Sequence, residues 1–193
     1  MKLFNTKYQN QGKDIFSVSQ LKNMIIPLFM EQILVMMVGI ADTLVVSYAG
    51  EAAVSGVSLV NQFNTIFIYL FSALAAGGSV VISQYLGRKE KDNAGEASSQ
   101  LLMFSTVFSV VIMALVLILK LPLLNLLFGD VEPDVMKASD IYFWISALSF
   151  PAIAVYNAGA AVYRSIGRTS VTMTVSVISN IINVIGNVIG VFA

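Results

Sequence analysis

The sequence contains no cysteine and no histidine, and only 11% of its 193 residues are charged. Without cysteine, the chain can form neither disulfide bonds nor thiolate metal sites. Without histidine, any proton relay inside it has to use carboxylates. A soluble domain carries about 25% charged residues, so this chain has too few charges to cover the surface of a soluble globule. Its net charge is zero, and no basic patch indicates a nucleic-acid partner.

Long apolar runs take the place of the missing charges. Hydrophobic residues make up 57% of the chain, and the mean hydropathy is +0.82. A membrane-spanning helix needs about 20 mainly apolar residues, whereas barrel strands alternate over segments of about ten. Continuous runs therefore predict an all-α integral membrane protein of one domain. We expect five spanning helices at about 23–49, 54–87, 96–119, 136–163 and 168–192.

Positive charges are distributed unevenly between the predicted loops. Of the eleven lysines and arginines, nine lie in the N-terminal tail and in the loops after the second and fourth helices, and two lie in the other loops. Loops rich in lysine and arginine face the cytoplasm. We therefore expect a cytoplasmic N-terminus, in a bacterial cytoplasmic (inner) membrane, and a fifth helix that runs outward.

Two acids lie within the first predicted helix, Glu31 near its cytoplasmic end and Asp42 in its outer half. Eleven residues make about three helical turns, so the two acids share nearly one face. A charge inside the bilayer costs roughly 3 kcal/mol, and such a residue usually faces a protein interior or a watery cavity. Asp42 is therefore the leading candidate for a functional acid. For Glu31, a buried acid satisfied by neighbouring hydroxyls or amides is an equal alternative.

The fifth predicted helix carries three asparagines, Asn180, Asn183 and Asn187, at spacings that place them along one stripe. Asp42 and Asn187 lie at similar distances from the cytoplasmic cations that precede their helices, hence at similar depth. An acid and amides at one level would line a single cavity if the first and fifth helices are neighbours. The alternative is that the asparagines form hydrogen bonds between helices.

Further polar residues and two prolines complete the set of candidates. Residues expected to line a cavity or contact a substrate are Glu31, Gln32, Asn61, Asn64 and Asn180. Proline removes a backbone donor and kinks a helix. Pro27 in the first helix is a candidate for bending between two states, and Pro151 in the fourth favours a static kink.

Several local patterns, in order along the chain, resemble the multidrug and toxic compound extrusion (MATE) transporters. The first helix contains Pro27, then Glu31-Gln32, then Gly-Ile-Ala-Asp-Thr at 39–43, and is followed by Gly50 and Ala-Val-Ser at 53–55. The later patterns are Ser-Gln-Tyr-Leu-Gly-Arg at 83–88, Leu-Phe-Gly-Asp at 127–130, Ala-Ser-Asp-Ile-Tyr at 138–142 and Tyr-Arg-Ser-Ile-Gly-Arg-Thr at 163–169.

The resemblance implies an antiporter of two six-helix lobes that expels cationic amphipathic compounds in exchange for protons or sodium ions. Asp42 matches the acid that the family ties to coupling-ion binding, and Pro27 matches the proline linked to bending. Asn183 and Asn187 match the polar pair that joins this acid. Some members carry an acid at the second position, so Asn187 leaves Asp42 as the only clear carboxylate of the outer cavity. We expect no cofactor and no metal site other than a possible sodium site at Asp42.

The chain is short for such a transporter, because the sixth helix and the C-terminal lobe are absent from it. It is expected to be a fragment, a truncated reading frame or half of a split protein. Its expected partners are membrane lipid, small cationic amphipathic substrates and the missing lobe. A lipid-linked oligosaccharide flippase is an alternative, although the expected spans lack the arginines of such a cavity. A non-transporting scaffold or assembly subunit is another, and nothing indicates an enzyme.

Overall fold

The computed structural model describes residues 18–48, 50–129 and 131–192. Three of the four tail lysines used to orient the chain, Lys2, Lys7 and Lys13, lie outside the described residues, so the cytoplasmic N-terminus stays a prediction. Every regular element of the described part is a helix. In chain order they are α1 (Val18–Ser47), α2 (Glu51–Gly87), α3 (Lys91–Ile118), α4 (Lys120–Phe128), α5 (Pro133–Leu148), α6 (Phe150–Ser165) and α7 (Thr169–Phe192).

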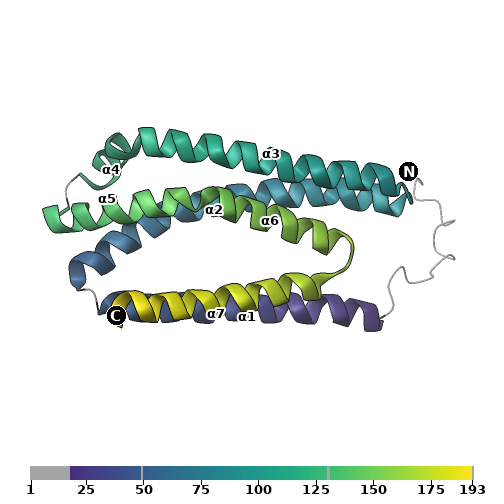
Figure 1. Cartoon of the computed structure of the whole chain (residues 1–193), viewed down its shortest axis with the longest axis horizontal. Helices are drawn as coiled ribbons and strands as arrows, with labels where there is room; N and C mark the ends of the chain where they lie inside the picture. The colour runs from purple at the N-terminus through teal and green to yellow at the C-terminus, as the bar shows by residue number, and fades with distance from the viewer. Residues whose placement is uncertain (1–17, 49, 130, 193) are drawn as a thin grey trace, which may run out of the picture.

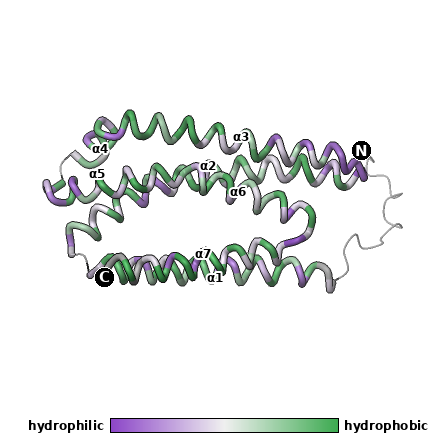
Figure 2. The backbone as a smooth tube through the Cα atoms, in the orientation of Figure 1, coloured by the Kyte–Doolittle hydropathy of each residue, from purple (hydrophilic) through white to green (hydrophobic). Residues whose placement is uncertain are grey.

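Four of these helices, α1, α2, α3 and α7, are individually long and apolar enough to cross a membrane. The pair α5 and α6 passes the same test jointly as one bent span, which makes five spans by length and composition. The hydropathy colouring shows apolar residues along the middle of the helices, with hydrophilic residues at the start of α3 and between α6 and α7 (Figure 2). The prediction of an all-α integral membrane protein with about five spans is confirmed.

Two features differ from the expected helix bounds. The fourth span, expected as one helix over 136–163, consists of α5 and α6, which meet at Ser149 with a bend of 43°. Pro151 lies in the first turn of α6, where a proline costs no hydrogen bond because that amide has no helical acceptor. The expected kink is therefore present as a break between two helices. The second difference is α4, which occupies residues expected to form a loop and buries Leu124 in the core.

The helices form two groups (Figure 1). α1 and α7 lie side by side along the lower edge of the view, while α2, α3, α5 and α6 pack against one another above them. The two groups meet where α1 leads into α2 and where α6 leads into α7. Contact between them is thus greatest toward the two ends of the bundle.

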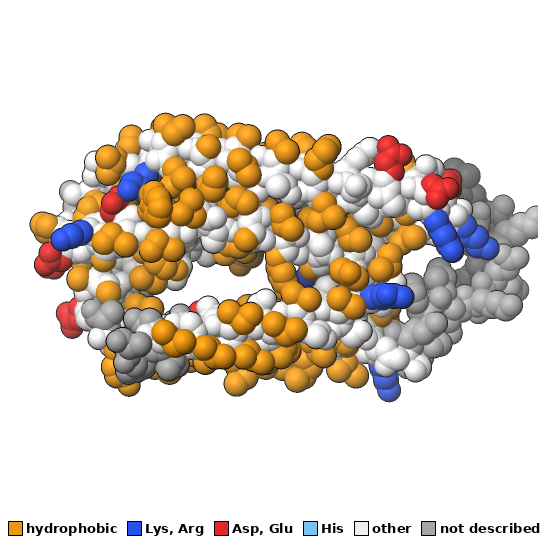
Figure 3. Space-filling view, in the orientation of Figure 1, with side chains coloured by type: hydrophobic (Ala, Val, Ile, Leu, Met, Phe, Trp, Pro, Cys, Tyr) orange, Lys and Arg blue, Asp and Glu red, His pale blue; other side chains and the backbone are white. Residues whose placement is uncertain are grey.

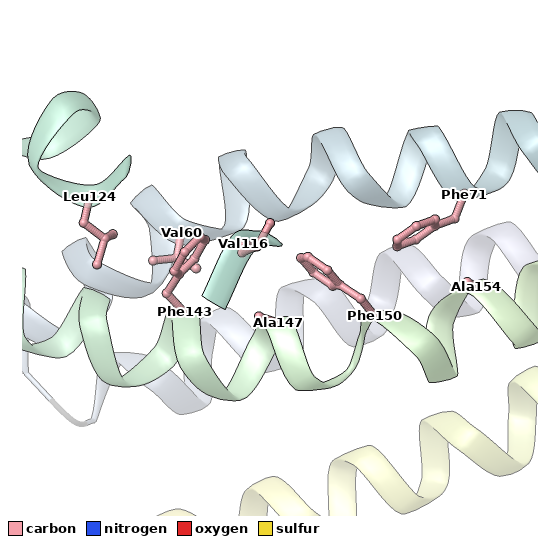
Figure 4. Close-up of a cluster of buried hydrophobic side chains, with 8 residues drawn as sticks. All are labelled: Val60, Phe71, Val116, Leu124, Phe143, Ala147, Phe150 and Ala154. Atoms are coloured by element: carbon pink, nitrogen blue, oxygen red, sulfur yellow. The ribbon is translucent and has the colours of Figure 1, made fainter. Parts of the chain in front are cut away.

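The buried apolar core belongs to the upper group. Its largest cluster combines side chains from α2, α3, α4, α5 and α6 (Figure 4), namely Val60, Phe71, Val116, Leu124, Phe143, Ala147, Phe150 and Ala154. The Phe150 ring lies 4.9 Å from that of Phe67 and 5.9 Å from that of Phe71, centroid to centroid. A second cluster joins α2, α3 and α6. Among the described side chains, α1 and α7 contribute to neither cluster.

Candidate functional site

A cavity of about 400 Å³ lies between α1, α2, α5 and α7. It separates the two helix groups, and the space-filling view shows the molecule open between them (Figure 3). Six of its lining residues are polar and come from all four helices: Asp42, Thr43, Ser58, Asn61, Tyr142 and Asn183. The rest of the lining consists of Gly39 and three valines. One acid is thus grouped with amide and hydroxyl groups in an otherwise apolar bundle.

The helices bring Asp42 and Asn183 to this cavity from sequence positions far apart. α1 packs along α7, which is the adjacency that the sequence left open. Asp42 lies in the last two turns of α1 and is half-buried. One residue on, the Thr43 hydroxyl donates to the Gly39 carbonyl at 2.9 Å. Asn183 comes from the middle of α7.

The opposite wall of the cavity is held by a hydrogen bond between α2 and α5. The Tyr142 hydroxyl donates to Oδ1 of Asn61 at 2.8 Å. About one turn nearer the start of both helices, α2 and α5 approach closely at Gly56, whose carbonyl accepts from the Ser139 hydroxyl at 3.4 Å. A Cβ placed on Gly56 would lie 2.9 Å from the Ser139 backbone nitrogen, so only glycine permits this approach without a shift. This wall is therefore closely packed.

The other predicted candidates lie elsewhere. Gln32 is exposed on α1, Asn64 is buried in α2, and Asn180 is partly buried in α7. None of the three is among the residues that line the cavity. Asn64 Oδ1 and Asn180 Nδ2 have no hydrogen-bond partner in the described part of the chain. Asn187 belongs to α7, but its side chain lies outside the described part of the structure.

Glu31 does not line the cavity and is only 3% exposed. Its carboxylate accepts from the Tyr156 hydroxyl at 3.3 Å and from the Thr172 hydroxyl at 3.2 Å. The Arg164 guanidinium lies 3.7 Å from the same oxygen that Tyr156 contacts. Glu31 is thus a buried acid satisfied by hydroxyls, which is the second of the two interpretations that the sequence allowed.

Sequence reasoning did not single out Tyr156, Thr172 or the residues near them on α7. A signal was present, because Thr169, Thr172 and Ser176 extend the asparagine stripe of α7 toward its start at the same helical spacing of three and four. All three of these hydroxyl side chains are buried. No group of three or more acids, histidines or cysteines is placed to hold a metal among the described residues.

A bundle of spanning helices with a polar cavity between two helix groups is an arrangement typical of membrane transporters. The chain belongs to the MatE family, whose sequence model matches residues 27–189. A protein of Bacillus subtilis (strain 168), the uncharacterized transporter YisQ, is 32% identical over 167 residues, which cover 86% of this chain and 36% of YisQ. A probable multidrug resistance protein NorM from Neisseria meningitidis serogroup B (strain ATCC BAA-335 / MC58) is 28% identical over 177 residues, 91% of this chain and 38% of NorM.

Solved structures share the fold. A multidrug resistance MATE family transporter of the MOP superfamily, in an outward-facing conformation, superposes with a TM-score of 0.84 at 20% sequence identity. The match covers 90% of this chain and 38% of that one. The chain therefore spans a little over a third of the length of the relatives it matches, a share consistent with the N-terminal lobe of such a transporter.

Proposed function

We propose that the chain forms part of an ion-coupled exporter of cationic amphipathic compounds in a bacterial cytoplasmic membrane, and that Asp42 binds the coupling ion. The observation that carries this proposal is that Asp42 of α1 and Asn183 of α7, which are far apart in the sequence, line one polar cavity. Multidrug resistance is the activity given to the NorM relatives, which supports the substrate class. The coupling ion is a proton or a sodium ion.

The lining of the cavity suits either ion. A carboxylate that is half-buried among apolar helices attracts a cation strongly, because the surroundings have a low dielectric constant. Oxygen atoms are the ligands that hard cations prefer, and Asn61, Asn183, Thr43 and Ser58 bring amide and hydroxyl oxygens to the same space. Binding would remove the charge of Asp42. It shifts the protein between two conformations only to the extent that the ion binds one of them better.

The flippase alternative finds less support at this site. Its substrate carries phosphate groups, which arginines would hold, and no arginine is among the residues that line the cavity. The scaffold alternative fits Glu31, whose hydrogen bonds link helices, but it leaves the polar cavity at Asp42 without a role. Transport therefore accounts for more of the described polar residues.

The experiment compares two aspartates of the same chain. Asp42→Asn is placed in the gene with its complete reading frame and expressed in drug-sensitive bacteria, alongside Asp92→Asn, an identical change at an exposed residue in the first turn of α3. Asp42→Asn is expected to abolish resistance to cationic dyes at unchanged amounts of protein in the membrane, whereas Asp92→Asn retains it. Full resistance with Asp42→Asn would overturn the proposal.

Proteoliposomes identify the ion. Dye efflux is measured under an imposed sodium gradient and, separately, under an imposed proton gradient. We expect one of the two gradients to drive efflux, and Asp42→Asn to remove that dependence. Efflux that needs neither gradient would contradict ion coupling while leaving export itself intact.

A further inference from the structure

A second polar cluster lies outside the cavity, where α1, α6 and α7 meet. We call it the Glu31 cluster, and it consists of Glu31 from α1, Tyr156 and Arg164 from α6, and Thr172 from α7. It occupies the end of the bundle near the α6–α7 connection, whereas the Asp42 cavity lies toward the α1–α2 connection. None of the cluster residues lines that cavity.

The carboxylate of Glu31, on α1, is the common acceptor for donors from α6 and α7. Tyr156 and Thr172 donate to its two different oxygens. The Thr172 hydroxyl also lies 2.8 Å from the Thr169 carbonyl, so its single proton is shared between two acceptors. Arg164 is the outermost member, because its side chain is 42% exposed and its 3.7 Å separation is longer than a charge-assisted hydrogen bond. The two hydroxyl contacts and the ion pair therefore hold the three helices together.

A second contact reinforces this junction about two turns toward the start of α1. In an α-helix the amide of each residue bonds to the carbonyl four residues earlier, and Pro27 has no amide hydrogen. The carbonyl of Asn23 is thereby left without its helical donor. The hydroxyl of Thr169, at the first residue of α7, lies 3.5 Å from this carbonyl and donates to it. The gap that Pro27 leaves in α1 is thus used to attach α7.

Apolar packing does not duplicate these contacts. The buried described side chains of α1 and α7 are all polar, namely Glu31, Thr169, Thr172 and Ser176. Both helices place their large apolar side chains outward, for example Phe29 and Ile182, which are 64% and 65% exposed. At this end, the α1–α7 pair is therefore attached to α6 by the polar contacts of Glu31 and by the short connection between α6 and α7.

We propose that Glu31 is a positioning residue that closes this end of the bundle, by holding α1 and α7 against α6. The proposal goes beyond the proposed function and does not depend on it. Hydrogen bonds between membrane helices are worth about 0.6 kcal/mol each, so a closure made of a few of them is weak enough to open.

The absence of native cysteine allows a direct test. Ala160 is 5% exposed on α6, one turn beyond Tyr156, and lines a small groove between α6 and α7 together with Tyr156 and Thr172. Ala160→Cys reports opening of this end through its reaction with a membrane-impermeant maleimide. The matched control is Ala154→Cys, which lies on the same helix, 1% exposed in the apolar core of the other helix group.

Each cysteine is combined with Glu31→Ala, with Tyr156→Phe and with Glu31→Gln, in the full chain in native membranes. We expect Glu31→Ala and Tyr156→Phe to speed the labelling of Ala160→Cys and to leave Ala154→Cys unreactive. Glu31→Gln, which keeps an acceptor oxygen, is expected to restore slow labelling. Unchanged labelling of Ala160→Cys in both disrupting variants would overturn the proposal, and so would labelling of both cysteines, which indicates a general loss of packing.

The labelling does not require transport, so the two proposals fail separately. If Asp42→Asn retained full export, the proposed function would fall while the labelling result stood. If the labelling were unchanged while Asp42→Asn abolished export, only the proposal that Glu31 closes this end of the bundle would be contradicted.

Discussion

The two helix groups of the molecule differ in the large apolar side chains that they bury. The group of α2, α3, α5 and α6 packs phenylalanines and small apolar residues against one another, whereas the α1–α7 pair buries only polar side chains among those described. In a bilayer, packing and hydrogen bonding replace the hydrophobic effect between helices. Close packing fixes the first group, and a few hydrogen bonds attach the second. The difference indicates a rigid unit and a separable one, with the Asp42 cavity between them.

The largest expected effect comes from the rigid unit. Phe150→Ala removes a side chain that is 1% exposed and in contact with two other rings, and we expect it to lower the free energy of unfolding by about 3 kcal/mol. The matched control is Phe29→Ala on α1, where the same ring is 64% exposed and the change should cost less than about 0.5 kcal/mol. Unfolding in micelles, followed by circular dichroism, measures both. Equal losses would show that α1 is packed as tightly as the core.

On α1, which belongs to the separable unit, we expect the loss of a buried polar side chain to cost more stability than the loss of an exposed phenylalanine ring. Glu31→Ala leaves the hydroxyls of Tyr156 and Thr172 without their common acceptor, and two such bonds plus the desolvated groups amount to about 2 kcal/mol. Glu31→Gln keeps an acceptor and should lose less than half of that. The same unfolding assay applies. A loss for Glu31→Ala no larger than that for Phe29→Ala would contradict a polar attachment of α1.

The parts of this architecture that were predictable from sequence are those set by local properties. The five spans follow from the lengths of apolar runs, because each helix in a bilayer has to satisfy its own backbone. The break at Ser149 was expected only as a kink at Pro151. α4 was not expected, because its leucine-rich sequence differs little from the end of the preceding span, and only the packing of Leu124 distinguishes it.

The site was predictable in part for the same reason. The common depth of Asp42 and the α7 asparagines follows from counting residues along two helices that run in the same direction. The contact between those helices depends on tertiary packing, as do the partners of Glu31, which lie 125 and 141 residues away. Periodicity along one helix cannot assign an acid to a partner on another, so the sequence left the role of Glu31 open between two interpretations, and its partners were found only in the structure.

A smaller effect tests whether the rigid unit extends to the cavity wall. A Cβ at Gly56 would lie 2.9 Å from the Ser139 backbone nitrogen, and because backbone cannot move aside easily, Gly56→Ala should cost about 1 to 2 kcal/mol. Gly77→Ala, on the same helix with open space around it, should be neutral or slightly stabilising. The free energies of unfolding of the two variants, measured in denaturant titrations, separate the cost of the steric clash at Gly56 from the general effect of glycine-to-alanine changes on helix stability. If both glycines tolerate alanine equally, α2 and α5 are not rigidly joined at this point.

The smallest expected effect lies at the boundary between the two units. Tyr142→Phe removes the hydroxyl that donates to Asn61 Oδ1 at 2.8 Å, and a single hydrogen bond of this kind should cost about 0.6 kcal/mol. Because Asn61 and Tyr142 both line the cavity, the freed amide oxygen remains within reach of water or of a bound cation, and the loss should not exceed this value. The free energy of unfolding of Tyr142→Phe measures it, with Tyr69→Phe as a control, since Tyr69 is 70% exposed on the same group of helices. A loss above about 2 kcal/mol would mean that the cavity wall is held by a coupled network rather than by one bond, and that the polar attachment seen at Glu31 is not confined to the α1–α7 pair.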